Sequence, residues 1–299
     1  NILMSEDIIN SINCLKKLGI KISINKKDCF IYGRGVNGFI FKKNIILDAG
    51  NSGTFARLIL GLLIKSPYYI KLIGDKSLSQ RDFERVVTPL QKIGAQFKIN
   101  NKKTLPLQII GSEFINPINY FENKGSAQCK STVMLAALLS PGHTVIKAKK
   151  SRDHTENIFK YLGIPIKIKK NDNYDEIKIK GKKFFKSFKY HVPSDPSSCA
   201  FFVVLTLLSK DCKLRIKNVN VNQSRIGYID ILNKMGAKIK IVNVKKKYGE
   251  KQADILVKSQ PKLKKINCPA SLNSSLIDEF LIIFLAAAKA NGVSSFTNL

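Results

Sequence analysis

Two kinds of helix-forming segment alternate along this chain. The first kind is amphipathic, with apolar residues three and four positions apart, and each copy runs into a glycine and then an alternating strand. The four copies are "CLKKLGIKISI", "PLQKIGAQFKI", "IFKYLGIPIKI" and "ILNKMGAKIKI", with their glycines at Gly19, Gly94, Gly163 and Gly236. Glycine suits the left-handed residue that ends many helices. The pattern therefore predicts four amphipathic helices, each leading into a strand and repeated about every 70 residues.

The second kind of segment begins with small polar residues and continues as a helix that is apolar on nearly every side. Its copies are "NSGTFARLILGLLI", "SAQCKSTVMLAALLS", "SDPSSCAFFVVLTLLS" and "SLIDEFLIIFLAAAKA", which start at Asn51, Ser126, Ser194 and Ser275. Such helices belong inside a domain, wrapped by amphipathic helices and sheets. The chain is therefore predicted to be α/β, built from repeated strand, buried helix, strand, amphipathic helix, strand, strand (βαβαββ) units.

The link over residues 189–193 suggests a domain boundary. Three amphipathic segments lie before this link and one lies after it. We therefore expect a first domain of three repeats over residues 1–191, without its opening element, and a partial second domain over residues 192–299, without its C-terminal part.

Charge and cysteine content narrow the class of protein. Lys and Arg number 51 against 21 Asp and Glu, a net charge of +30, but the lysines are spread in short pairs and triplets along the whole chain. This spread favours a solvated surface over a dedicated nucleic-acid face, although such a surface still attracts small anions.

The six cysteines form no C-x-x-C motif, which predicts reduced thiols in a cytoplasmic protein. No apolar run approaches the roughly 18 residues of a membrane span.

One glycine-rich stretch matches a dinucleotide-binding motif, but its context does not favour that interpretation. The stretch "GRGVNG" over residues 33–38 matches G-x-G-x-x-G, but a dinucleotide site needs a helix to open at Gly38. The segment that follows, "FIFKKNIILDAG", alternates and is rich in β-branched residues, so we expect a hairpin instead.

Arginine is scarce, and most arginines stand near predicted helix starts. Arg57 lies one turn into the first apolar helix, where a guanidinium needs a carboxylate partner or a bound anion. Arg81, Arg152 and Arg225 open three of the amphipathic segments. Such arginines either converge on an anionic ligand or pair with local acids such as Asp82 and Asp153, and the sequence leaves both interpretations open.

The polar starts of the apolar helices also allow two interpretations. A helix N-terminus with a glycine such as Gly53 offers free N–H groups to a phosphate or carboxylate. Alternatively, Asn51, Ser52 or Thr54 simply caps the helix. Asp278 and Glu279 form the acidic pair inside an apolar segment, so Asp278 is a candidate for acid–base chemistry or hydroxyl binding, with stabilisation of a helix start as the alternative. His154 is a candidate general base, or a structural histidine.

Seven stretches, in order and over nearly the whole chain, resemble the 5-enolpyruvylshikimate-3-phosphate synthase family of enolpyruvyl transferases. They are "LDAGNSGTFARLILGLL", "GDKSLSQRDFERVVTPLQKIGA", "GSAQCKSTVMLAALL", "KSRDHTENIFKYLGI", "VPSDPSSCAFFVV", "NQSRIGYIDILNKMGA" and "LIDEFLIIFLAAA". The resemblance implies two inside-out α/β domains with buried helices. It also implies transfer of the enolpyruvyl group of phosphoenolpyruvate to the 5-hydroxyl of shikimate 3-phosphate, on the pathway to chorismate and aromatic amino acids. It implies a cytoplasmic monomer with no metal, no redox cofactor, no nucleic acid and no membrane partner.

The resemblance also implies roles for individual residues. Those expected to hold phosphoenolpyruvate are Gly53, Arg81 and Gln128. Those expected to hold shikimate 3-phosphate are Ser126, Ala127, Gln128, Arg152 and Asp278. Asn51, Thr54 and Arg57 are expected to shape the first helix start. Asp278 and Glu279 form the expected catalytic pair, with Asp278 binding ring hydroxyls and helping to deprotonate the attacking one.

The chain departs from the family pattern in two respects. Asp82 follows Arg81 where the family commonly has proline. The family's lysine-serine-arginine and lysine-glutamate-arginine motifs are expected beyond the two ends, so we expect the 299 residues alone to be inactive. Two alternatives remain: UDP-N-acetylglucosamine enolpyruvyl transferase, which usually carries a cysteine in the loop before Arg81 where "LIGDKSLSQ" has none, and a non-catalytic basic binding protein.

Overall fold

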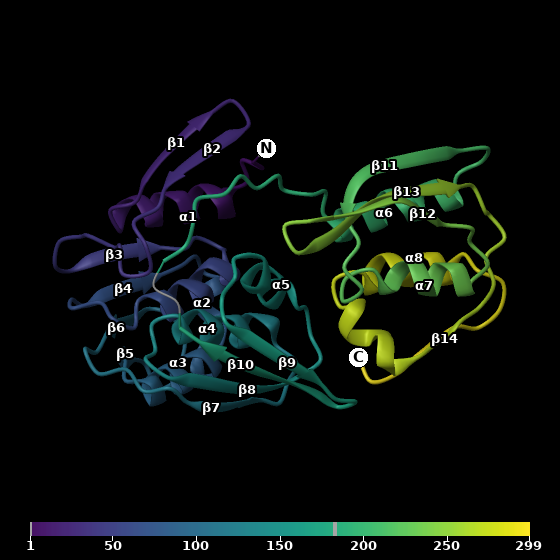
Figure 1. The fold of residues 1–299 in the computed structure, drawn as a ribbon. Coiled ribbons are helices and arrows are strands. Elements are labelled where there is room, and N and C mark those ends of the chain that lie inside the picture. The colour runs from purple at the N-terminus through teal and green to yellow at the C-terminus, as the bar shows by residue number, and fades with distance from the viewer. Residues whose placement is uncertain (1, 182–183) are drawn as a thin grey trace. The chain divides into compact units, whose positions relative to one another are not determined.

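The chain divides into two compact units. A computed structural model describes residues 2–181 and 184–299. The first unit combines Asn1–Lys150 with Leu162–Lys189, and the second combines Ser151–Tyr161 with Tyr190–Leu299 (Figure 1). The second unit thus includes the short segment that contains Arg152 and His154.

The first unit opens with a helix and a hairpin and then repeats one pattern twice. The opening elements are α1 (Glu6–Lys17), β1 (Lys21–Asn25) and β2 (Asp28–Tyr32). The first repeat comprises β3 (Ile45–Asp48), α2 (Gly53–Leu62), β4 (Ile70–Ile73), a 3-10 turn (Leu78–Gln80), α3 (Glu84–Ile93), β5 (Gln96–Ile99) and β6 (Leu107–Ile110). The second comprises β7 (Asn119–Glu122), α4 (Ala127–Ala137), β8 (His143–Lys149), α5 (His154–Tyr161), β9 (Ile166–Lys170) and β10 (Tyr174–Lys180), although α5 groups with the second unit.

The two repeats build sheets of the same topology. Their strand orders are β3-β4-β6-β5 and β7-β8-β10-β9. In each sheet the first two strands are parallel, with Ile45 opposite Ile70 and Asn119 opposite Val145, and the other neighbours are antiparallel. The predicted order of strand, buried helix, strand, amphipathic helix, strand, strand is therefore confirmed.

Helices α2 and α4 pack against each other inside the first unit. Each is capped by a serine: the Ser52 hydroxyl accepts from the Phe55 N–H, and the Ser126 hydroxyl accepts from the Cys129 N–H. At Gly61 the two backbones approach so closely that a methyl group would lie 2.3 Å from the Thr132 carbonyl oxygen. This close approach explains why an apolar helix carries a glycine in its last turn.

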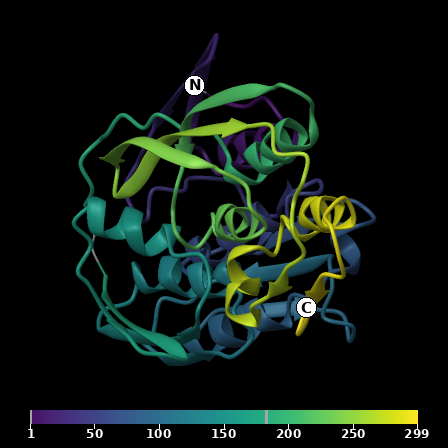
Figure 2. The ribbon, with the colours of Figure 1, turned by 90° about the vertical axis from the view of Figure 1, so that its right-hand side faces the viewer.

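The second unit continues the same pattern, with a main sheet of longer strands and one short two-residue pair. Its elements after α5 are α6 (Pro196–Leu208), β11 (Lys213–Asn220), α7 (Gly227–Lys234), β12 (Lys240–Lys247), β13 (Glu250–Lys258), β14 (Asn267–Cys268), a 3-10 turn (Ala270–Ser275), α8 (Phe280–Ala288) and β15 (Ser295–Phe296). The sheet order is β11-β13-β12, and the expected opening strand is reduced to a parallel bridge between Ser194 and Val219. Figures 1 and 2 show this sheet on one side of α6, α7 and α8.

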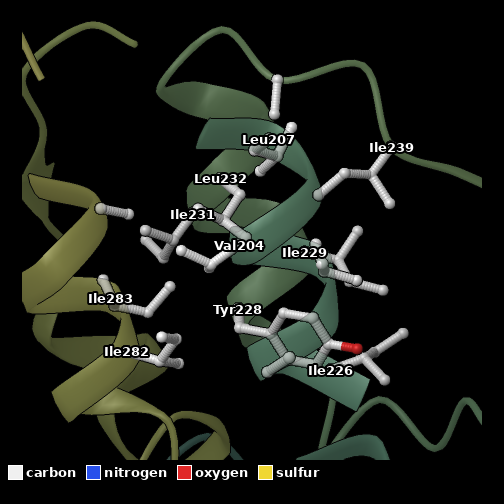
Figure 3. Packing of buried hydrophobic residues seen from close by; sticks show 14 of the residues in the cluster. Val204, Leu207, Ile226, Tyr228, Ile229, Ile231, Leu232, Ile239, Ile282 and Ile283 are labelled. Carbon is white, nitrogen blue, oxygen red and sulfur yellow. The ribbon is translucent and has the colours of Figure 1, made fainter. Parts of the chain in front are cut away.

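The core of the second unit lies among α6, α7 and α8 and the inner face of the sheet. Ile283 of α8 faces Val204 of α6 and Ile231 of α7, and the ring of Tyr228 is fully buried beside them (Figure 3). Asp195 caps α6 by accepting from the Ser198 N–H, with Pro196 in the first turn.

Two expectations about the apolar helices are wrong in the second unit. The helix predicted from Ser275 begins instead at Phe280, because Ser275 ends a 3-10 turn and residues 276–279 form a further turn. Helices α6 and α8 are also not covered on all sides, since Leu205 is 63% exposed and Leu281 is 78% exposed. The described elements supply one three-stranded sheet and one two-stranded pair here, too few to cover both sides of these helices.

The predicted glycine caps are confirmed. All four glycines at the ends of the amphipathic segments have positive φ, between 65° and 129°, as the left-handed cap requires. The residues at 33–38 form a loop between β2 and β3 with no helix at Gly38, so no dinucleotide fingerprint exists there. The hairpin expected after them is wrong, because a single strand, β3, follows. Among the described helices, none is both long and apolar enough to cross a membrane.

Candidate active site

In the first unit, the start of α2 is fixed by the loop that follows β4. The Asn51 side-chain amide donates to the Asp75 carboxylate, and the other Asp75 oxygen accepts from the Leu78 N–H at 2.7 Å. The Asp75 N–H donates in turn to the Gly50 carbonyl at 2.8 Å. These hydrogen bonds hold the pKa of the Asp75 carboxyl below its ordinary value. The loop that carries Arg81 is therefore held against the loop that opens α2.

Arg81 lies directly over the first residue of α2. A methyl group built on Gly53 would be 2.7 Å from Nη1 of Arg81. The Arg81 side chain is exposed, and within residues 2–181 and 184–299 it has no hydrogen bond or ion pair. A helix N-terminus and an unengaged guanidinium thus lie side by side, and both attract an anion.

Arg57 joins the starts of α2 and α4. Its Nη1 donates to the Gln128 side-chain oxygen at 2.5 Å, and its Nη2 donates to the Asp82 carbonyl at 3.2 Å. The Gln128 amide then donates to the Thr54 hydroxyl at 2.8 Å. Among the described residues Arg57 has neutral acceptors and the Phe83 ring, 5.6 Å away, in place of the carboxylate partner suggested by the sequence. The other alternative, a bound anion, stays a prediction, and Nε of Arg57 is buried without a hydrogen-bond partner in this part of the chain.

The electrostatics around Arg57 favour an anion nearby. Burial lowers the pKa of the Arg57 guanidinium, and the charges of Arg81 and Arg85 lower it further, although Cys129 and Asp82 act in the other direction. Of these three arginines, Arg85 has a carboxylate partner in the described chain, the buried Glu122. The other two cations leave this edge of the unit positively charged.

The start of α4 is fixed from behind by Glu122. One carboxylate oxygen of Glu122 accepts from Nη2 of Arg85 and the other accepts from the Ser126 N–H at 2.8 Å. The Ser126 hydroxyl caps the helix, and Ala127 is the first helical residue. The structure therefore places Ser126, Ala127 and Gln128 at one helix start, and Gln128 lies against the start of α2.

In the second unit, Arg152 and Asp278 form an ion pair. Nη2 of Arg152 donates to Oδ2 of Asp278, and both side chains are partly exposed. The partner that the structure shows for Arg152 is therefore 126 positions away in the chain, whereas Oδ1 of the adjacent Asp153 accepts from the Asn222 amide at 2.7 Å and from Asn157. The prediction that Asp278 lies buried in an apolar segment is wrong, since it precedes α8 and is exposed.

Glu279, beside Asp278, is the buried member of the acidic pair. Its carboxylate accepts from the Ser197 hydroxyl at 2.5 Å. Arg225 donates to the same hydroxyl at 2.8 Å and to Asp195 at 3.0 Å. Burial raises the pKa of Glu279, and the neighbouring Asp278 carboxylate adds to the rise, although the hydrogen bond from Ser197 opposes it. A carboxyl group in this setting retains its proton to higher pH.

His154 takes part in a separate network at the start of α5. Its Nδ1 lies 2.8 Å from a Glu250 oxygen, and Glu250 also accepts from the Asn222 amide at 3.1 Å. Burial acts to raise the pKa of Glu250, but the hydrogen bond and charge of His154 hold it below its ordinary value. Together with the contact between Asn222 and Asp153, this network anchors the helix that follows Arg152.

Several residues of these networks carried no signal in the sequence. Asp75, Glu122, Ser197 and Glu250 each make a hydrogen bond to a residue at least 20 positions away in the chain. Such contacts depend on tertiary structure, and a single sequence does not contain them. Asp75 offers a local hint, because its hydrogen bond from the Leu78 N–H follows the usual spacing of a helix cap.

Comparisons with known proteins decide the family. The family model described as EPSP synthase (3-phosphoshikimate 1-carboxyvinyltransferase) matches residues 1–299. The chain belongs to the EPSP synthase family. A curated relative from Ruthia magnifica subsp. Calyptogena magnifica, named 3-phosphoshikimate 1-carboxyvinyltransferase, is 42% identical over 298 residues, which are 99% of this chain and 67% of the relative. A relative of the same name from Petrotoga mobilis is 39% identical over 296 residues, 98% of this chain and 67% of the relative.

The solved structures agree with this family. EPSP synthase from Acinetobacter baumannii superposes with a TM-score of 0.86 at 34% sequence identity, covering 97% of this chain and 65% of that one. The predicted α/β fold and the predicted resemblance are confirmed. The chain spans about two thirds of the length of the EPSP synthases that it matches.

Proposed function

We propose that the protein containing this chain transfers the enolpyruvyl group of phosphoenolpyruvate to the 5-hydroxyl of shikimate 3-phosphate. In the first step the hydroxyl oxygen bonds to the central carbon of phosphoenolpyruvate, the methylene carbon gains a proton, and the hydroxyl loses one. In the second step the bond from that central carbon to the phosphate oxygen breaks, and the methyl group returns a proton. Phosphate leaves, and the carbon–carbon double bond is restored.

The first unit supplies groups suited to phosphoenolpyruvate. Gly53 leaves the backbone at the start of α2 without a side chain in the way, and Arg81 offers a guanidinium beside it. The Gly53 N–H donates to the Asn51 carbonyl at 2.9 Å and the Phe55 N–H donates to the Ser52 hydroxyl, so within the described residues the Thr54 N–H is the donor left for an anion. Gln128 is held at the same helix start by its hydrogen bonds to Arg57 and Thr54. These donors stabilise the negative charge of the phosphate and carboxylate groups as the adduct forms. Asn51, Thr54 and Arg57 act on the substrate indirectly, by fixing these donors in place.

Groups in both units suit shikimate 3-phosphate. Ser126, Ala127 and Gln128 form the start of α4, where backbone N–H groups favour a phosphate. Arg152 and Asp278 pair with each other in the second unit. The Asp278 carboxylate orients the Arg152 guanidinium, whose remaining N–H groups suit the substrate phosphate. The partly exposed Asp278 carboxylate can accept hydrogen bonds from the ring hydroxyls.

Asp278 is the proposed base, with Glu279 as the member of the pair that retains a proton. Asp278 is exposed and its carboxylate is held by Arg152, so it can accept a proton from a hydroxyl. Burial raises the pKa of Glu279, and this stabilises its protonated form. The proposal also includes a cytoplasmic monomer that requires no cofactor, nucleic acid or membrane. Analytical ultracentrifugation tests the monomeric state, and assay of the metal-free protein tests the lack of a metal requirement.

The contact between Gly53 and Arg81 supports the proposal most directly, since it joins two residues 28 positions apart that the family resemblance assigns to one substrate. The test is turnover of the protein that contains this chain, followed by phosphorus NMR. Phosphate release is expected only when phosphoenolpyruvate and shikimate 3-phosphate are both present. Equal release with UDP-N-acetylglucosamine in place of shikimate 3-phosphate contradicts it. The same assay on the 299-residue chain tests the prediction that this chain is inactive alone.

A variant of Asp278 and a matched control variant distinguish loss of the catalytic base from a general effect of removing a carboxylate. Asp278→Asn keeps the shape of the side chain but removes the base, so kcat is expected to fall by about 100- to 10,000-fold. Asp230→Asn changes an exposed carboxylate on α7 of the same unit and serves as the matched control. Equal activity of the two variants contradicts the role of Asp278.

A further inference from the structure

A positively charged depression lies on the sheet of the second unit, away from the residues assigned above. Its volume is about 280 Å³, and its lining includes Arg215 and Lys217 of β11, Lys245 and Lys247 of β12, and Gln252 of β13. We call this depression the sheet pocket. It lies on the face of the sheet opposite the core, because Leu214 and Ile216 of β11 pack on the core while Arg215 and Lys217 alternate with them.

Two bulges shape the sheet pocket. The register of β11 shifts between Ile216 and Val219, and that of β12 shifts between Val242 and Lys245. Asn218 and Asn243, one in each bulge, have left-handed φ angles of 53° and 54°. Bulges redirect side chains and often occur at functional sites. Here they flank the central strand from both sides.

One carboxylate, Asp254, holds the two bulges together. One of its oxygens accepts from the Asn218 N–H at 3.0 Å, and the other accepts from the Asn243 amide at 3.0 Å and from Arg215 at 2.6 Å. These bonds hold the pKa of Asp254 far below its ordinary value, so its charge is constant at neutral pH. Both oxygens of Asp254 are therefore occupied, and Arg215 is neutralised.

Three lysines remain without partners at the sheet pocket. No hydrogen bond or ion pair involves the ammonium groups of Lys217, Lys245 and Lys247 within the described parts of the chain. The pocket lining therefore has four cations and one carboxylate, a net charge of +3. Unneutralised lysines that converge on one depression attract an anion from solution.

Gln252 provides an independent indication that a ligand binds here. Its side chain is 4% exposed, and its amide nitrogen has no hydrogen-bond partner among the residues that the structure describes. A buried N–H group without an acceptor is unfavourable. The neighbouring lysines are donors only, and both oxygens of Asp254 already accept hydrogen bonds from other groups. An anion bound in the sheet pocket would supply the acceptor that Gln252 lacks within the described residues.

We propose that the sheet pocket binds a small phosphate-type oxyanion, either free phosphate or the phosphate group of a small metabolite. The volume is just below the roughly 300 Å³ at which pockets begin to hold drug-sized molecules, so one oxyanion with a short attached group fits. The oxyanion accepts hydrogen bonds from the Gln252 amide and from the three lysines. The proposal does not depend on the reaction proposed above.

Solution NMR tests this site separately from the proposed active site. The 299-residue chain, labelled with nitrogen-15, is titrated with inorganic phosphate and, in a second series, with glycerol 3-phosphate. The backbone amides of Asn218 and Asn243 and the side-chain amide of Gln252 are expected to shift and saturate. Amides at the start of α2 report any binding at the active site. Tighter binding of glycerol 3-phosphate than of phosphate identifies a metabolite as the ligand, and equal binding identifies the free ion.

Three variants test the assignment of individual groups. Gln252→Glu replaces the donor with a carboxylate of the same size, and phosphate affinity at the sheet pocket is expected to fall by at least about tenfold. Lys247→Met is expected to reduce the affinity by about threefold to tenfold. Lys246→Met, an exposed neighbour outside the pocket lining, is the matched control and is expected to leave affinity unchanged.

Three results would overturn the proposal. One is an absence of saturable shifts at Asn218 and Asn243 up to about 50 mM phosphate. Another is equal weakening by Lys246→Met and Lys247→Met, which would indicate only general surface charge. The third is tighter binding of a single-stranded oligonucleotide than of phosphate at these amides, which would indicate a nucleic-acid surface. The exposed lysine variants keep the test valid if Gln252→Glu fails to fold.

Discussion

Substitution of Gly53 by alanine is expected to weaken anion binding without weakening the fold. The new methyl group would lie 2.7 Å from Nη1 of Arg81 and 3.6 Å from the nearest Leu78 carbon. The Leu78 distance is an ordinary contact, so the clash falls on the flexible end of one exposed arginine. Gly53 has a negative φ, is the first residue of α2, and alanine is a better helix former than glycine.

The size of the effect follows from this geometry. Carbon–nitrogen contacts below about 3.4 Å are unfavourable, so the guanidinium must move by roughly 0.7 Å or more from its place beside the helix start. A hydrogen bond between charged groups contributes about 1.5 to 3 kcal/mol, so its loss weakens binding by about 10- to 100-fold. Isothermal titration of phosphoenolpyruvate measures the affinity, and urea unfolding measures the free energy of unfolding, which is expected to change by less than about 1 kcal/mol.

The matched control is Gly33→Ala. Gly33 lies in a loop of the same unit, has a negative φ, and has no atom within 4 Å of an added methyl group. This control is expected to leave both affinity and stability unchanged. Unchanged phosphoenolpyruvate affinity in Gly53→Ala would refute the assignment of Gly53 and Arg81 to one anion site. A loss of stability as large as the loss of affinity would refute it as well, because the clash would then lie in the fold.

Three further predictions concern stability and reactivity. Glu122→Gln weakens the ion pair with Arg85 at the start of α4, and it is expected to lower the free energy of unfolding by about 2 kcal/mol in urea. Glu279→Gln is expected to stabilise the protein near neutral pH. Because the folded pKa of Glu279 is raised, ionisation penalises the folded state, so the advantage disappears as pH falls towards 4.5, as urea unfolding across this range measures. Ellman's reagent is expected to label the exposed Cys212 well before Cys199, since burial raises the pKa of the Cys199 thiol to about 11; a Cys212→Ser variant should lack the fast phase.

Local patterns in the sequence predicted the repeat well. The spacing of apolar residues and the glycines identified the amphipathic helices, and one of the three expected cap residues, Ser52, does cap its helix. The structure adds Ser126 and Asp195 as caps of two further apolar helices. These features depend on residues close together in the chain, where side-chain spacing decides the outcome. The same reasoning placed the fourth apolar helix too early, at Ser275, because a 3-10 turn and a helix start have similar polar residues.

The candidate site was predicted less completely, because its contacts are long-range. The sequence identified Arg57 as unusual and suggested a carboxylate partner or a bound anion, whereas within the described residues an amide oxygen from α4 and a backbone carbonyl accept its hydrogen bonds. The supports of the site, Asp75 and Glu122, could not be found without the fold. The exposed faces of α6 and α8 were also not predictable, since an apolar helix has the same sequence pattern whether neighbouring elements cover it or not.

The arginines near the starts of the amphipathic helices show how one repeated position takes on different roles. In the second unit, Arg225 is held by Asp195 and Ser197, and Arg152 is held by Asp278. In the first unit, Arg81 has the glycine of α2 beside it and no protein partner within the described residues. A paired arginine contributes to orientation and stability, whereas an unpaired one beside a helix N-terminus has its charge available to a ligand. Of these three residues, Arg81 is therefore the one whose replacement by lysine should reduce phosphoenolpyruvate affinity with the least effect on folding.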